Sequence, residues 1–337
     1  MTDLIEFDFD SVLDGIESAE SSLSLTPDTD YTIDPRLTRL SYSGRGTLHS
    51  CPRRYQLEKI SKIPHQREEN VTLAFGTVVG IGIQYQLERR SWNDTVMAML
   101  LAWSVPDLFA TEDRVKKGFF EAIFAVQQFS TVRETALADY DLAYTPEGKP
   151  ATEFSFRITV FDQFQYRGYI DAVLSHRETG KLLVLEVKTT GYNEIHESTY
   201  GNSSQATGYS VVLDTVAPGL SEYEVWYLVY KTGKQEFEIL PFRKLHSDRA
   251  TWIRELVMDC QRIEAYEAEQ HYPAYGESCR NYGRDCEFYG TCKMSTAVLS
   301  LPYDPRNPAM QDRDEGNYMV ELNLLDLIDT QLAKEEL

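Results

Sequence analysis

The sequence predicts a mixed α/β fold in which a central sheet is flanked by helices. Residues 43–143 carry apolar side chains mostly at helical spacing, which indicates a helical N-terminal part. After about residue 150 the pattern changes to short segments rich in β-branched and aromatic side chains. The chain has 337 residues, of which 42% are hydrophobic, and this is sufficient for a sizeable core.

The helices and strands follow from where these patterns begin and end. Segments 71–90 and 112–138 lack proline and are expected to form long helices. Short polar turns separate the strand-like segments, and further helices are expected at about 199–213 and 246–270. The expected strands are 152–161, 165–175, 181–189, 222–231 and 235–243.

The net charge of −20 is concentrated at the two ends of the chain. Residues 1–35 hold ten acids and no Lys or Arg, and we expect them to form an acidic disordered tail. Residues 303–337, with nine acids and three basic residues, form a second acidic tail that either packs on its own domain or docks on a partner. The folded domain is expected over 36–302, where the charge is only about −4 and does not exclude a basic groove for nucleic acid.

No stretch resembles a membrane span or a secretory signal. A spanning helix needs about 20 apolar residues in a row, and the chain has no such run. Its first residues are acidic, whereas a signal peptide begins with basic residues. We therefore expect a cytoplasmic protein without membrane association.

Two acids and a lysine lie on neighbouring predicted strands. Asp171 is followed after fourteen residues by Glu186, and Lys188 lies two positions further along a mostly apolar strand. Alternation along a strand sends Glu186 and Lys188 to the same face. Carboxylates bind Mg²⁺ or Mn²⁺, and such an ion together with an ammonium group can promote hydrolysis of a phosphodiester. Because an unpaired charge in a buried strand is costly, the pattern favours a catalytic role.

Because Asp171, Glu186 and Lys188 occur in this order, the chain resembles the RecB-like branch of the PD-(D/E)xK nucleases. This branch includes phage exonucleases, AddB-like subunits and CRISPR-associated iron-sulfur nucleases. The resemblance covers roughly residues 40–294 and implies a restriction-endonuclease-like fold with a helical insertion at about 90–145. It implies that Asp171, Glu186 and the Val187 carbonyl bind the metal ion and that Lys188 is the catalytic lysine. Gln205 and Tyr209 match the family's Q-x-x-x-Y helix and are implied to lie beside the active centre and contact DNA.

One position departs from the family pattern. The family usually has a metal-binding histidine on the helix before the sheet, where this chain has Gln84. A glutamine amide oxygen can bind a hard cation or hold a water, but it is a weaker ligand than imidazole for Mn²⁺. Glu153 is a candidate for an additional carboxylate, although it is equally consistent with a surface acid at the end of a strand.

Four cysteines suggest a second site. Cys51 stands apart from Cys279, Cys286 and Cys292, and four thiolates suffice to hold an iron-sulfur cluster or a zinc ion. The resemblance favours a 4Fe-4S cluster that joins the two ends of the domain, with zinc and unmetallated thiols as the alternatives. Basic and aromatic residues lie around these cysteines, namely Arg53, Arg54, Tyr55, Arg280 and Arg284. They indicate either a channel for single-stranded DNA or, equally, solvated positive charges around a metal site.

These observations predict a metal-dependent DNA exonuclease from a bacterial or bacteriophage setting. It would process DNA ends during recombination, repair or phage replication, with a recombinase, annealing protein or helicase as partner. The alternatives are a structure-specific endonuclease and a catalytically silent iron-sulfur subunit that binds DNA or assembles a complex. Exonucleolytic cutting is inferred from the resemblance alone.

Overall fold

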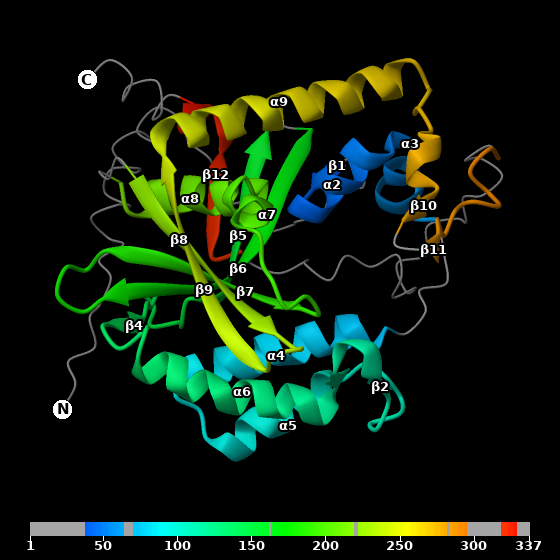
Figure 1. The fold of residues 1–337 in the computed structure, drawn as a ribbon. Coiled ribbons are helices and arrows are strands. Elements are labelled where there is room, and N and C mark those ends of the chain that lie inside the picture. Colours follow the sequence, from blue (N-terminus) through cyan, green and yellow to red (C-terminus); the bar gives the residue numbers. More distant parts are fainter. Residues whose placement is uncertain are drawn as a thin grey trace. The chain divides into compact units, whose positions relative to one another are not determined.

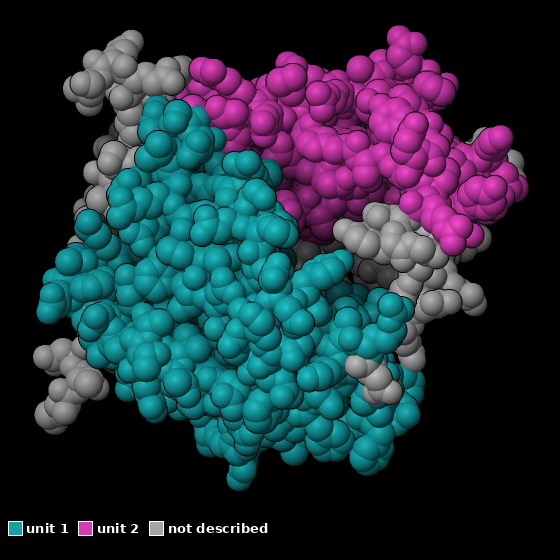
Figure 2. Space-filling model, in the orientation of Figure 1, with its two compact units in different colours: residues 1–26, 69–154, 169–249 teal, residues 27–68, 155–168, 250–337 magenta. Residues whose placement is uncertain are grey.

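The structure is a computed structural model that describes residues 38–63, 70–161, 163–218, 222–281, 284–294 and 318–328 (Figure 1). The predicted tail at 1–35 and residues 303–317 lie outside the described residues. The chain divides into two compact units that alternate along the sequence (Figure 2). Described residues of the first unit fall within 70–154 and 169–249, and those of the second within 38–63, 155–168 and 250–328.

The first unit holds the helical segment and most of the sheet. Strands β5 (Thr152–Val160) and β6 (Phe164–His176) continue into the second unit, and α9 (His246–Ala268) begins in the first. The remaining elements are α4 (Val71–Leu87), α5 (Trp92–Ala102), β2 (Thr111–Glu112), a 3₁₀ turn (Asp113–Val115), β3 (Lys117–Gly118), α6 (Phe119–Glu134), β4 (Tyr140–Leu142), β7 (Leu182–Thr190), α7 (Glu197–Gly201), α8 (Ser204–Val216), β8 (Glu222–Lys231) and β9 (Glu236–Leu245).

The sheet of the first unit is mixed. Strand β6 pairs antiparallel with β7, β7 parallel with β8, and β8 antiparallel with β9. The parallel step needs a crossover, and α7 and α8 supply it. Helices α4 and α6 contact β7 and β9, while α8 packs on β7, β8 and β9 (Figure 1). A mixed central sheet flanked by helices confirms the predicted fold class.

The main core lies between the sheet and the helices α4 and α6. Leu183, Leu185 and Leu228 point from β7 and β8 into it, together with aromatic and aliphatic side chains of both helices. Alternation along β7 sends Val184 and Glu186 to the opposite face. The core therefore fixes which face of β7 presents its acid.

The second unit contains the ends of the described chain. Strand β1 pairs parallel with β6, and β12 pairs parallel with β5. Leu324 and Leu327, just after β12, are buried. Its remaining elements are β1 (Thr38–Leu40), α2 (Tyr42–Ser50), α3 (Pro52–Tyr55), a π-helical turn (Gln56–Ile60), a 3₁₀ turn (Gly276–Ser278), β10 (Arg280–Asn281), β11 (Arg284–Asp285) and β12 (Val320–Asn323).

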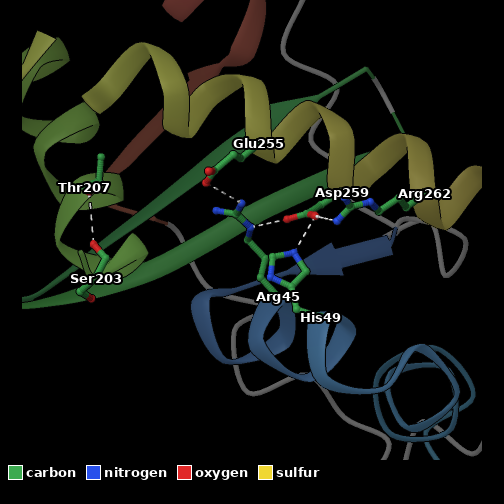
Figure 3. Close-up of polar contacts among 7 residues, drawn as sticks. All are labelled: Arg45, His49, Ser203, Thr207, Glu255, Asp259 and Arg262. Atoms are coloured by element: carbon green, nitrogen blue, oxygen red, sulfur yellow. Dashed lines mark hydrogen bonds and ion pairs between the residues drawn. The ribbon is translucent and has the colours of Figure 1, made fainter. Parts of the chain in front are cut away.

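A buried ion pair joins α2 to α9 in the second unit (Figure 3). Arg45 and Asp259 are 3% and 1% exposed, and the Arg45 Nε lies 2.6 Å from Asp259 Oδ2. The other oxygen, Oδ1, lies 2.7 Å from His49 Nε2 and 3.3 Å from Arg262 Nη1. Both oxygens of Asp259 are therefore engaged, which is what keeps a buried carboxylate tolerable.

Two predicted helices differ from the structure. The segment predicted as one helix over 112–138 begins with the short strand pair β2 and β3, and α6 starts only at Phe119. The helix predicted at about 199–213 is divided at Asn202 and Ser203 into α7 and α8. None of the helices in the described ranges is both long and apolar enough to cross a membrane.

Candidate active site

Asp171 and Glu186 come from adjacent strands of the first unit. The antiparallel register places Ala172 opposite Leu185, and one further step leads to Asp171 and Glu186. The Val187 N–H donates a 2.7 Å hydrogen bond to Asp171 Oδ2. The two acids predicted to bind the metal are thus brought together by strand pairing, and the Val187 backbone is next to them.

Burial places both carboxylates in an environment that disfavours their charged forms. Burial, followed by the Glu186 charge, raises the pKa of Asp171 well above its usual range. Burial also raises the pKa of Glu186, although Lys188 opposes the shift. Glu186 is 1% exposed, and its Oε2 has no hydrogen-bond partner among the described residues. A cation at this oxygen would satisfy both the missing contact and the excess negative charge.

Lys188 lies beside the acids as predicted. Its Nζ is 2.5 Å from Glu186 Oε1. Burial lowers the pKa of Lys188, but the Glu186 and Asp171 carboxylates outweigh it, so the pKa is raised overall. Lys188 therefore keeps its proton and is available as a positive charge.

The predicted polar pair on α8 also reaches this site. Gln205 Nε2 donates to the Tyr209 hydroxyl at 2.7 Å, and that hydroxyl donates to the Tyr169 carbonyl at 2.7 Å. Tyr169 precedes Asp171 by two residues on β6. The backbone carbonyl of Tyr169 carries no sequence signal, so this contact was not predicted.

Gln84, on α4, contacts a carboxylate. Its Nε2 donates a 2.7 Å hydrogen bond to Glu153 Oε1. The side chain of Gln84 is 8% exposed, whereas Glu153 is exposed. The structure therefore brings the residue at the expected histidine position together with the additional candidate acid.

The residues of this site fit a divalent cation held by Asp171 and Glu186. The fit rests on the unpartnered Glu186 Oε2 and on oxygen donors of the type that Mg²⁺ and Mn²⁺ prefer. Within the described ranges, no group of three or more His, Cys, Asp or Glu side chains is arranged to hold a metal ion. The described cysteines likewise form no such group of three or more side chains.

The four predicted cluster cysteines all belong to the second unit, and all are free thiols. Cys286 N–H donates to the Cys279 carbonyl at 2.8 Å. Burial raises the pKa of the Cys292 thiol, and the nearby thiols of Cys51 and Cys279 add to this shift. The unit thus gathers the cysteines into one region without showing a metal-binding arrangement of them.

The predicted DNA-binding arginines are partly engaged within the second unit. Arg53 Nε donates to the Cys292 carbonyl at 2.9 Å, and Arg54 Nη2 lies 3.2 Å from Glu287. Arg280 is exposed and 4.0 Å from Asp285. The Arg284 side chain, like the neighbouring Tyr282, lies outside the described residues.

Tyr55 corrects the predicted channel. Its side chain is 0% exposed and belongs to the core of the second unit, so it is not available to stack on a base. Burial is also the main cause of its raised pKa. The apolar ring of a tyrosine beside basic residues does not distinguish a stacking surface from a core position.

The model of the PD-(D/E)XK nuclease superfamily matches residues 39–293. A solved structure from Eubacterium rectale, described as a candidate exonuclease, is 12% identical, with a TM-score of 0.47 over 76% of this chain and 91% of that chain. The solved structure of SSO0001 is 14% identical, with a TM-score of 0.33 over 86% of this chain and 96% of that chain. No curated protein sequence matches the chain.

Proposed function

Because the chain belongs to the PD-(D/E)XK nuclease superfamily, we propose that it is a divalent-metal-dependent deoxyribonuclease that cuts exonucleolytically from DNA ends. The observation that supports this most strongly is the juxtaposition of Asp171, Glu186 and Lys188 around a buried, unpartnered Glu186 oxygen. Nucleases of this superfamily generally use divalent metals such as Mg²⁺ or Mn²⁺.

The proposed roles of the side chains follow from their positions. Asp171 and Glu186 would hold the cation, which when bound polarises the scissile phosphate and activates water. Lys188 stays protonated beside Glu186 and is placed to stabilise negative charge that develops on the phosphate. Tyr209, fixed between Gln205 and the Tyr169 carbonyl, would hold α8 beside the acids.

Exonucleolytic cutting is tested with end-labelled linear DNA and covalently closed circular DNA of the same sequence. We expect metal-dependent loss of the linear substrate, single- or double-stranded, while the circle stays intact because it has no end. Cutting of the circle at a comparable rate would support the structure-specific endonuclease instead. If neither substrate is cut with Mg²⁺ or Mn²⁺, the silent DNA-binding subunit would become the better account.

We propose in addition that Cys51, Cys279, Cys286 and Cys292 hold a 4Fe-4S cluster of structural role. Their location in one unit supports the proposal, as does the hydrogen bond from the Cys286 N–H to the Cys279 carbonyl. Such a cluster would close a loop of more than two hundred residues, which restricts the unfolded chain. Purified under anaerobic conditions, the protein should contain about four irons per chain.

The control for this proposal is Cys260→Ser. Cys260 is fully buried in α9, and it belongs to the same unit but not to the predicted ligand set. We expect Cys286→Ser to lose iron while Cys260→Ser retains it. Stoichiometric zinc in place of iron, or iron content unchanged by Cys286→Ser, would reject the cluster.

A process that resects DNA ends leaves single strands, so a recombinase, annealing protein or helicase is the partner class that we propose. In the second unit, the side chain of Arg280 is exposed and could contact the phosphates of a DNA strand.

A further inference from the structure

A third carboxylate, Glu153, lies beside the proposed metal site. The Val173 N–H donates a 2.9 Å hydrogen bond to the Ala151 carbonyl, which sets β5 against β6. Two steps along each strand, in opposite directions, lead from that pair to Glu153 and Asp171. Because Asp171 and Glu186 are neighbours in the same way, three acids occupy adjacent positions on three consecutive strands.

The backbone of Glu153 departs from a regular strand. Its φ is +45°, in the left-handed region that residues with a Cβ normally avoid. Strained residues of this kind persist where the surrounding structure holds them and are frequent at functional sites. The Glu153 carboxylate accepts a 2.7 Å hydrogen bond from the amide of Gln84 on α4.

The row places three carboxylates side by side, and among the described residues the salt bridge that reaches it is that of Lys188 with Glu186. Like charges at opposed positions of adjacent strands destabilise a sheet. Lys188 contacts Glu186 through Oε1, while Oε2 remains buried and unpartnered among the described residues. Burial is the largest cause of the raised pKa of Asp171 and of Glu186, and the Glu153 charge adds to it in both. Glu153 is thus close enough to act on both acids.

We propose that Glu153 is the third carboxylate that attracts the divalent cation to Asp171 and Glu186, and that Gln84 is a positioning residue that holds Glu153 rather than a ligand of the cation. The inference rests on the proposed nuclease function. Gln84 and Glu153 together would then replace the metal-binding histidine that the resemblance implies at position 84. The Gln84 side chain is only 8% exposed, and its amide donates a hydrogen bond to Glu153. It is therefore suited to fixing the orientation of the Glu153 carboxylate.

The test is the affinity of the full-length protein for Mn²⁺, measured by electron paramagnetic resonance of the free ion in the absence of DNA. We expect Glu153→Gln to weaken Mn²⁺ binding by about tenfold, because partners beside metal ligands typically contribute this much. The matched control is Glu178→Gln, which removes the same charge from the exposed turn between β6 and β7. It should leave the affinity unchanged, and thermal melting should show all variants folded.

A double-mutant cycle separates positioning from ligation. If Gln84 acts through Glu153, Gln84→Ala weakens Mn²⁺ binding in the wild-type background but has no further effect in Glu153→Gln. If Gln84 is itself a ligand, the two losses add and the positioning role is overturned. Unchanged Mn²⁺ affinity in Glu153→Gln overturns the role of Glu153.

The outcome also distinguishes this inference from the proposed function. A wild-type protein that binds Mn²⁺ and cuts DNA, while Glu153→Gln binds equally well, refutes the inference and leaves the nuclease intact. A wild-type protein that neither binds Mn²⁺ nor cuts DNA refutes both.

Discussion

Replacing Lys188 by alanine is expected to slow DNA hydrolysis by about 10²- to 10³-fold, the loss typical of removing one group that stabilises developing charge. The ammonium of Lys188 contacts Glu186 and keeps its proton, and we propose that it stabilises the negative charge that develops on the phosphate. The measurement is the single-turnover rate of cleavage of end-labelled DNA at saturating Mn²⁺.

The same variant should not bind Mn²⁺ more weakly, because losing the ammonium removes a competitor for the carboxylates. This split between rate and affinity distinguishes a catalytic role from general damage to the site. Lys181→Ala is the control, since Lys181 is an exposed lysine at the start of the strand region that carries the acids. A Lys188→Ala rate within a factor of about three of wild type would exclude Lys188 from the chemistry.

Replacing Asp259 by alanine is expected to lower the free energy of unfolding by about 3–5 kcal/mol, because it removes the nearest carboxylate from the buried Arg45 guanidinium and leaves the more distant and exposed Glu255, at 3.8 Å. Arg45 also lies over the Trp252 ring, 5.5 Å from its centroid, and cannot move into water without disrupting that contact. Urea unfolding monitored by circular dichroism measures the change.

A matched control lies on the same helix. Glu264 is an exposed acid of α9, and Glu264→Ala should change the free energy of unfolding by less than about 0.5 kcal/mol. Equal losses in the two variants would show that net charge on α9, rather than the buried pair with Arg45, determines stability.

The strands and the acid pair were predictable because they depend on local pattern. The segment predicted at 165–175 is β6 (Phe164–His176), and that at 222–231 is β8 with the same bounds. Given three successive strands, the spacing of Asp171 and Glu186 places them on adjacent strands, and the register confirms this neighbourhood.

Features that depend on tertiary context were not predictable. No strand is predicted in the C-terminal tail, yet Val320–Asn323 adds a parallel strand to β5, and a helix follows at 324–328. Tyr55 lies among basic residues in the sequence yet is buried. Likewise the contact of Gln84 with Glu153 joins residues 69 positions apart, and only the folded chain brings them together.

We propose that Asp171 and Glu186 form the metal site of a deoxyribonuclease. This metal site is tested most directly by the rate of linear DNA hydrolysis by the wild-type protein and by Glu186→Gln, each with Mg²⁺ or Mn²⁺ and again after chelation. We expect the wild-type protein to cut DNA only while the metal is present, and Glu186→Gln to be inactive under all conditions. Cleavage by the wild-type protein that persists after chelation, or cleavage by Glu186→Gln at the wild-type rate, would contradict the proposal.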